Sequence, residues 1–365
     1  MSRRVYLHIG APKTGTTYVQ DRLSINRDTL LKHGIDFPTN SRKVDADLFH
    51  FRAALDVLGQ DWGGPTGHAA GAWDAMTKLV ARSRHTVVIS HEIFAPATAE
   101  QIEKILDGLR GRDVHVVYSA RDLGRQLPAA WQESIKQGRK WPFRRFLNKV
   151  EQGSTWFYKA FDLPAVLERW SQAVPLRNVH VVTVPPGTAL RANKDLLWHR
   201  MCETFEIDPA WAPEESHRAN KSLGVAETQV LRQLNRRMER VVRREAAFDE
   251  LIREKLAHDL LSARKSDPVR LPPQRFDWAD DRAEEWIQWL ATSGVHVVGD
   301  VEELRPVRPA EDAKWVNPDA MRPKLMLNGA LDALAAMTME AASRSDPSHS
   351  RFGRVREVRE RLLGR

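Results

Sequence analysis

The feature that most constrains the fold is an alternation of short apolar strands with helical segments. Runs rich in β-branched residues occur at residues 4–9, 86–90, 114–120 and 179–184, and segments with helical spacing of apolar residues lie between them. This order is typical of parallel βαβ units, because a helix returns the chain before the next parallel strand begins. The sequence therefore predicts an α/β fold, with a parallel β-sheet flanked by helices.

The helical segments have recognisable ends. Within residues 16–34, apolar side chains recur at helical spacing up to Gly34, which predicts one continuous helix. A second helix is expected to begin at Thr98, because Gln101 three residues later can complete a capping box. Further helices are expected over residues 72–82, 121–138 and 163–174.

Polar residues and glycines follow directly on three of the strands, at residues 10–17, 91–92 and 121–125. The carboxyl ends of parallel strands meet at one edge of the sheet, and ligands of α/β proteins bind there. The sequence therefore predicts one ligand site built from these three stretches.

The first stretch, GAPKTGTT, has the outline of a phosphate-binding loop. Gly10 and Gly15 have the separation found in GxxxxGK[ST], where the lysine that follows the second glycine reaches the β- and γ-phosphates. Here Thr16 occupies that position, and Lys13 lies inside the loop instead. The Walker arrangement around a metal-bound triphosphate is therefore missing.

The loop can still bind a phosphate. Backbone amides near Gly15, at the start of the following helix, point at an anion, and the hydroxyls of Thr14, Thr16 and Thr17 add donors. A lysine within the loop suits a ligand that carries an already activated group for transfer. Such a ligand needs only the charge on its bridging oxygen neutralised.

The motif PKTGTT after a strand resembles the 5′-phosphosulfate loop of sulfotransferases that use 3′-phosphoadenosine 5′-phosphosulfate (PAPS). The resemblance implies a P-loop-like parallel sheet, PAPS as co-substrate and no metal. It implies that Lys13 contacts the oxygen between phosphate and sulfate, while the rest of the loop holds the 5′-phosphate. The binding residues implied are Lys13, Thr14, Gly15, Thr16 and Thr17. The resemblance covers roughly the first 190 residues in scattered pieces.

A second signature of that family is an Arg-Asp pair after a strand, with a serine eight residues beyond the arginine. Arg121 and Asp122 match the pair, and the resemblance implies that Arg121 binds the 3′-phosphate, for which a guanidinium is well suited. The serine position is Ala129, which departs from the pattern and removes one hydrogen bond. Arg125, or the downstream residues 218–222, could replace that donor.

The acid/base residue of the family commonly follows the strand between these two signatures, as a histidine in one branch and a glutamate in others. The sequence VVISHEIF offers both, His91 and Glu92, although the lysine of the histidine branch is Ile89 here. Either side chain could take the proton of an acceptor as it attacks sulfur. We favour His91 slightly, because its ordinary pKa of about 6.5 needs less tuning, whereas Glu92 would need burial.

The acceptor is left open as a small molecule, a glycan or a lipid head group that offers a hydroxyl or an amine. Phe51, Trp62 and Trp73 lie between the first strand and the strand before His91, where they could shape a pocket. Packing in the core is the commoner use of tryptophan.

The chain is basic, with 56 Lys and Arg against 48 Asp and Glu. The arginine-rich segment 227–245 could bind an anion, but solvated arginine faces are common, and no nucleic acid is expected as a partner. A single cysteine, no apolar leader at the N-terminus and no apolar run near the roughly 18 residues that span a bilayer indicate a cytoplasmic protein without a transmembrane segment.

The predicted domain organisation has three parts. Residues 1–222 form the sulfotransferase-like α/β core, residues 223–343 a helical extension packed on it, with a possible late strand at 295–304, and residues 344–365 a polar linker and short charged helix. The predicted function is PAPS-dependent sulfuryl transfer. The alternatives are an atypical P-loop kinase that uses ATP and Mg²⁺, an inactive sulfotransferase-like protein, and a basic nucleic-acid-binding protein. The oligomeric state stays open.

Overall fold

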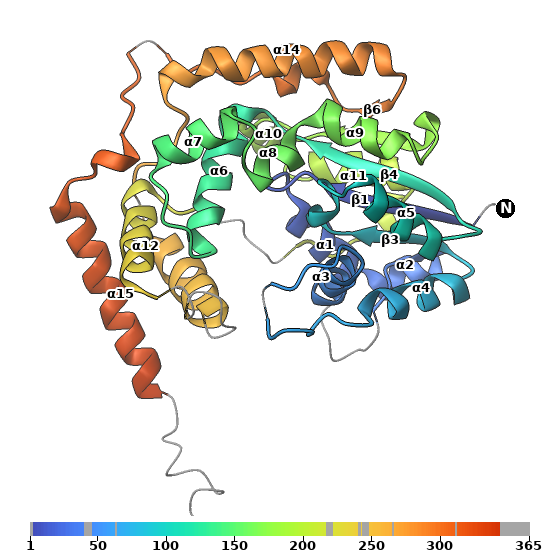
Figure 1. Cartoon of the computed structure of the whole chain (residues 1–365), viewed down its shortest axis with the longest axis horizontal. Helices are drawn as coiled ribbons and strands as arrows, with labels where there is room; N and C mark the ends of the chain where they lie inside the picture. The colour runs from blue at the N-terminus through green and yellow to red at the C-terminus, as the bar shows by residue number, and fades with distance from the viewer. Residues whose placement is uncertain are drawn as a thin grey trace, which may run out of the picture.

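The computed structural model describes residues 3–39, 46–62, 64–216, 222–239, 242, 248–264, 266–310 and 312–343. Its centre is a six-stranded, all-parallel sheet with the strand order β2-β3-β1-β4-β5-β6 (Figure 1). The strands are β1 (Arg4–Gly10), β2 (Ile35–Asp36), β3 (Thr86–Ser90), β4 (Asp113–Ala120), β5 (Val179–Thr183) and β6 (His296–Val298). The predicted α/β class, a P-loop-like parallel sheet flanked by helices, is confirmed.

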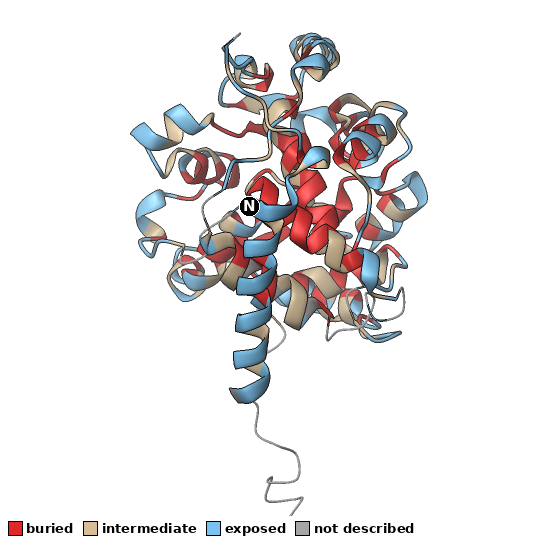
Figure 2. Ribbon diagram, turned by 90° about the vertical axis from the view of Figure 1, so that its left-hand side faces the viewer, coloured by how far each residue is buried: buried red, intermediate tan, exposed pale blue. Residues whose placement is uncertain are grey.

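Helices cover both faces of the sheet. Alternate residues of β1 enter two separate hydrophobic clusters, with Val5 and Leu7 in one and Tyr6 in the other, as a strand period of two requires. The helices before the extension are α1 (Thr16–Ile25), α2 (Arg27–Lys32), α3 (Ala46–Val57), α4 (Ala72–Arg82), α5 (Ala99–Gly108), α6 (Leu123–Lys136), α7 (Phe143–Glu151), α8 (Trp156–Phe161), α9 (Leu163–Ser171), α10 (Gly187–Ala192) and α11 (Leu196–Phe205). Figure 2 shows the buried residues gathered at the centre of the molecule.

The single helix predicted over residues 16–34 is wrong, because the chain breaks it at Asn26. The Asn26 amide nitrogen donates to the carbonyls of Arg22 and Glu214, both at 2.9 Å, and its oxygen accepts from the Glu214 amide at 2.9 Å. A side chain that bonds to backbone competes with the helical ladder. A segment far along the chain therefore decides where α1 ends and α2 begins.

The helix predicted from Thr98 is found as α5, and its capping box with Gln101 is present. The segment after residue 223 contributes more than helices. Its strand β6 pairs with β5 in the central sheet, at the place of the late strand that the sequence suggested. The longer helices of this segment are α12 (Val225–Arg237), the π-helix η5 (Asp249–Leu260), α14 (Phe276–Ser293) and α15 (Pro323–Ser343).

Helix α12 packs against both α6 and α15. Arg232 of this arginine-rich helix is buried, with its Nε donating to Gln229 Oε1 at 2.8 Å, so it does not belong to a solvated face. Residues 240, 243 and 244 of the same arginine-rich segment lie outside the described residues.

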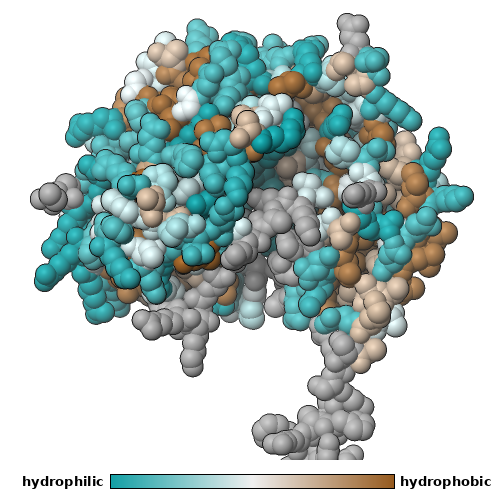
Figure 3. All heavy atoms as spheres, turned by 180° about the vertical axis from the view of Figure 1, so that it is seen from behind, coloured by the Kyte–Doolittle hydropathy of each residue, from teal (hydrophilic) through white to brown (hydrophobic). Residues whose placement is uncertain are grey.

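Helix α15 carries exposed apolar side chains, and Figure 3 shows hydrophobic residues along it. They are Leu325, Leu327, Leu331, Leu334 and Met339. Its contact with the rest of the protein runs through its other side, where Ala333 is buried. Within the described part of the chain, no helix, α15 included, is both long and apolar enough to cross a membrane.

Two buried histidines support the carboxyl edge of the sheet. His8 in β1 lies with Nδ1 2.8 Å from Ser90 Oγ and Nε2 2.7 Å from Ser119 Oγ, and so links β1 to β3 and β4. His50 in α3 accepts from the Ser90 amide at 3.1 Å and donates to the Pro38 carbonyl at 2.9 Å. Burial lowers the pKa of His8 and of His50 to about 4.

These two histidines predict acid sensitivity. The unfolded chain binds their protons below about pH 6.5, whereas the folded protein does not until about pH 4. Their contribution to stability is therefore complete above pH 6.5 and lost as pH falls towards 4, with a slope of up to about 1.4 kcal/mol per pH unit for each histidine. The free energy of unfolding, measured with urea at several pH values, should depend less steeply on pH for His8→Gln than for the natural protein. An unchanged slope would contradict the assignment.

Candidate active site

The loop between β1 and α1 has an unusual backbone. Lys13 (φ 66°) and Gly15 (φ 93°) are both left-handed, while Thr14 between them is not. Such an alternation turns successive amides into one concavity that suits an anion. A left-handed lysine costs about 1–2 kcal/mol, and strain of this kind persists where the surroundings enforce it, often at functional sites.

Side chains from α6 and from the end of β4 enforce this conformation. Gln126 Nε2 donates to the Pro12 carbonyl at 2.8 Å, and Arg121 Nη1 donates to the Lys13 carbonyl at 2.8 Å. Within the loop, the Thr14 hydroxyl donates to the Ala11 carbonyl. The carbonyls of Ala11, Pro12 and Lys13 thereby accept hydrogen bonds from side chains, which fix the course of the loop.

Glycine at position 10 lets the start of the loop pack directly against Glu92. A Cβ at Gly10, where φ is +95°, would lie 2.8 Å from Glu92 Cβ and 2.9 Å from Glu92 Cα. Because β3, β1 and β4 are neighbours, residues 10–17, 91–92 and 121–125 share the carboxyl edge of the sheet. The structure thus brings the three predicted stretches together.

Among the described residues, no carboxylate forms an ion pair with the Arg121 guanidinium. Its neighbour Asp122 instead caps α6, accepts from the Arg125 amide at 2.9 Å and pairs with the Arg125 guanidinium. Burial, aided by the charge of Arg125, lowers the pKa of Arg121 to about 10, still well above neutrality. Among the described residues, Arg121 Nε is buried without a hydrogen-bond partner. This guanidinium can bind an anion that enters beside the loop.

Arg125, suggested from the sequence as a replacement for the missing serine at Ala129, is occupied elsewhere. Its guanidinium donates to the carbonyls of Pro185 at 2.8 Å and Val184 at 3.1 Å, and so ties α6 to the end of β5. Residues 218–221, the other suggested source of donors, lie outside the described part of the chain.

His91 sits against aromatic side chains. Its Nδ1 accepts from the Ile93 amide at 3.2 Å, and its ring stacks on Phe51 with centroids 5.0 Å apart. Phe51 in turn meets Trp62 edge to face at 5.1 Å, and Trp62 is exposed. Although His91 keeps some exposed surface, desolvation, together with His50, Arg253 and His8, lowers its pKa to about 3. His91 is therefore neutral and a weak base.

Glu92 has the opposite shift. Burial raises its pKa, the charge of Lys13 opposes that shift, and the nearby carboxylate of Glu133 adds to it. The Thr16 hydroxyl lies near enough to the Glu92 carboxyl to lower its pKa slightly, but without forming a geometrically good hydrogen bond. The surroundings thus favour Glu92 over His91 as a proton acceptor at neutral pH, the reverse of the preference drawn from the sequence.

Two further charged residues, which the sequence analysis missed, complete the cluster. Lys13 Nζ lies 3.1 Å from Glu133 Oε2, and Arg253 Nη2 lies 3.3 Å from Glu133 Oε1. Burial alone would raise the pKa of Glu133, but the charges of Lys13 and Arg253, with a smaller contribution from Lys136, outweigh it and lower that pKa to about 2. Glu133 lies on α6 and Arg253 on η5, and neither belongs to a motif that could have revealed it.

The donor set fits a phosphate-bearing ligand. Thr16 Oγ1 and Arg121 Nε are buried polar atoms that lack a hydrogen-bond partner within the described residues, and both border the loop with its left-handed Lys13 and Gly15. Buried polar atoms are normally paired, so unpaired ones at such a loop are consistent with a ligand that supplies the partners. The described residues contain no cluster of three His, Cys, Asp or Glu side chains suited to a metal ion.

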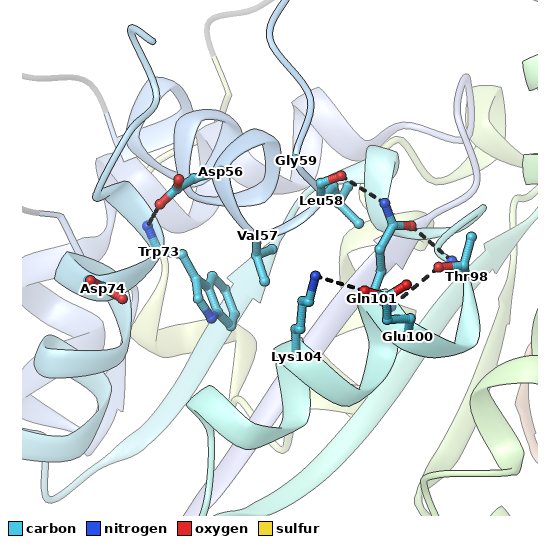
Figure 4. Close-up of a pocket in the computed structure, with 10 residues that line it drawn as sticks. All are labelled: Asp56, Val57, Leu58, Gly59, Trp73, Asp74, Thr98, Glu100, Gln101 and Lys104. Carbon is cyan, nitrogen blue, oxygen red and sulfur yellow. Dashed lines mark hydrogen bonds and ion pairs between the residues drawn. The ribbon is translucent and has the colours of Figure 1, made fainter.

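Two cavities lie apart from this cluster. One, of about 600 Å³, is lined by residues of α3, α4 and α5, among them Trp73 and the ion pair of Lys104 with Glu100 (Figure 4). The other, of about 670 Å³, is lined by Arg144, Arg232 and Trp315 among others. Neither is lined by a predicted catalytic or cofactor-binding residue. Of the three aromatic residues suggested for an acceptor pocket, Phe51 and Trp62 therefore lie beside His91, and Trp73 lines a separate groove.

Comparison with solved structures finds a distant structural likeness to a sulfotransferase. A solved structure of a sulfotransferase from Alicyclobacillus acidocaldarius matches with a TM-score of 0.37 and 15% sequence identity, over 67% of this chain and 100% of that chain. No protein-family model matches the sequence. No curated protein matches it either.

The close approach at Gly10 predicts a large effect of one added methyl group. Gly10→Ala combines a strained φ with a clash against Glu92, so it should destabilise the protein by about 1–3 kcal/mol more than Gly111→Ala. Gly111 is the matched control, because its φ is +78° and an added Cβ would meet nothing within 4 Å. Urea unfolding of both variants measures the difference. Equal losses would show that the loop does not rest on Glu92.

Proposed function

We propose that this protein transfers a sulfuryl group from PAPS to a hydroxyl or amine acceptor. The observation that carries this proposal is the convergence, at one edge of the sheet, of Lys13 in a strained loop, the Arg121 guanidinium, which pairs with no carboxylate of the described residues, and the Glu92 carboxyl. Two cations for a doubly phosphorylated donor and one base for an acceptor are the groups that such a transfer requires.

The contacts of the free protein support the binding roles that we propose. The loop amides, that of Thr14 included, and the hydroxyls of Thr16 and Thr17 would hold the 5′-phosphate, with Gly15 allowing its close approach; the Thr14 hydroxyl donates to the Ala11 carbonyl instead. Arg121 would bind the 3′-phosphate, since its Nη1 donates to the loop and its buried Nε has no hydrogen-bond partner in the part of the chain that the structure describes.

PAPS supplies an activated sulfuryl group. As a bond forms between the acceptor atom and sulfur, the bond from sulfur to the bridging phosphate oxygen breaks. Lys13 Nζ stabilises the charge that develops on that leaving oxygen. Glu92 takes the proton of the acceptor, because its raised pKa makes it a stronger base than His91.

The acceptor would approach along His91, Phe51 and Trp62. These rings form a continuous set of contacts from the half-buried imidazole to an exposed indole. Aromatic walls of this kind stack on the apolar faces of rings, and they leave a small molecule, a glycan and a lipid head group as acceptor classes.

The donor prediction is tested by calorimetric titration with adenosine 3′,5′-bisphosphate, the desulfonated product, beside ATP with Mg²⁺. We expect the bisphosphate to bind more tightly than ATP. Lys13→Ala and Arg121→Ala should each weaken it about 10- to 100-fold, the loss typical of a charge-assisted hydrogen bond. Lys104→Ala, which removes an exposed cation paired with Glu100, is the control and should have no effect. Preference for ATP would instead favour a kinase.

The choice of base is tested with water as acceptor, by following slow release of the bisphosphate from PAPS. The rate should rise with pH as Glu92 loses its proton, and Glu92→Gln should lower it about 10²- to 10⁴-fold and abolish that rise. His91→Asn should keep the rise of the rate with pH, since His91, with a pKa of about 3, is already neutral where Glu92 loses its proton. The opposite pattern would assign the base to His91.

A further inference from the structure

The Glu133 carboxylate is shared between two cations that come from distant parts of the chain. Lys13 Nζ lies 3.1 Å from one oxygen and Arg253 Nη2 lies 3.3 Å from the other. The Glu133 side chain is only 11% exposed, against 30% for Lys13 and 39% for Arg253. The carboxylate is thus the most buried member of the cluster, and the two cations reach it from more exposed positions.

Lys13 has two competing tasks. In the free protein its ammonium is paired with Glu133, but an anion bound in the loop would require the same ammonium. When Lys13 leaves, Glu133 would become a buried carboxylate without that partner, and removing one partner of a buried pair is strongly destabilising. A second cation that stays on Glu133 removes most of this penalty.

We propose that Arg253 is this second cation, a positioning residue that keeps Glu133 neutralised while Lys13 turns to the anion in the loop. Helix η5, which carries Arg253, packs against α6, which carries Glu133. The segment after residue 223 therefore takes part in the transfer site, although no motif marks it. The identity of the anion as PAPS rests on the proposed function, but the control of Lys13 by Glu133 and Arg253 does not.

Lys13 release can be measured without any ligand. The rate of acetylation of the Lys13 amine by an acetyl ester, followed by mass spectrometry, reports how often the ammonium leaves Glu133. We expect Arg253→Ala to slow this rate about 3- to 10-fold, in line with couplings between contacting charged side chains. Glu133→Gln should speed it. In the double variant Arg253→Ala/Glu133→Gln, the rate should match Glu133→Gln within about twofold.

The same variants are titrated with adenosine 3′,5′-bisphosphate. Arg253→Ala should weaken binding about 3- to 10-fold in the natural background and have little effect in the Glu133→Gln background. Arg253→Lys should restore most of the affinity, because it keeps the charge. Lys255→Ala is the matched control, since Lys255 lies on the same helix and pairs with Glu340 at 3.8 Å.

The outcomes separate this inference from the proposed function. If Arg253→Ala changes neither rate nor affinity, or if its effects persist without Glu133, Arg253 does not act through Glu133 and the inference is overturned. If no protein binds the bisphosphate but the acetylation pattern holds, PAPS is the wrong ligand, and the control of Lys13 stands.

Discussion

The site depends on the direct contact between Gly10 and Glu92. Only a residue without a side chain lets the end of β1 pack directly against Glu92. Glycine also tolerates the φ of +95° with which the chain turns from β1 into the loop. This contact sets the distance between a lysine-bearing loop and a carboxyl group with a raised pKa. The hydrogen bonds from Arg121 and Gln126 then fix the loop from the opposite side.

Charge balance is the second determinant of the site. Lys13 and Arg253 pair with Glu133, and Lys13 also opposes the shift at Glu92; burial prevails at Glu92 and at Arg121, whereas the neighbouring cations prevail at Glu133. Burial and the charge of Glu133 raise the pKa of Glu92, while Lys13 and Arg253 lower the pKa of Glu133. Two carboxyl groups of similar ordinary pKa thereby differ in the folded protein: the pKa of Glu92 is raised, and that of Glu133 is lowered to about 2.

Local patterns revealed much of this architecture. The β-branched runs identified four strands of the sheet, the capping box located the start of α5, and the spacing of Gly10 and Gly15 located the loop. The helix break at Asn26 was missed, because the bonds that cause it reach Glu214. The burial of Arg232 was also missed, because it depends on distant segments: α6 and α15 pack against α12, and nothing in the sequence of α12 itself indicates this.

The sequence by itself determined the parallel α/β class, the order of the loop and strand ends, and the candidate residues Lys13, Glu92, His91 and Arg121, because periodicity and short motifs are local properties of a chain. Only the tertiary structure decided that Glu133 and Arg253 join them, and that burial favours Glu92 over His91 as a base. The physical reason is that electrostatic environment depends on which distant groups surround a side chain, and that information arises only when the chain has packed.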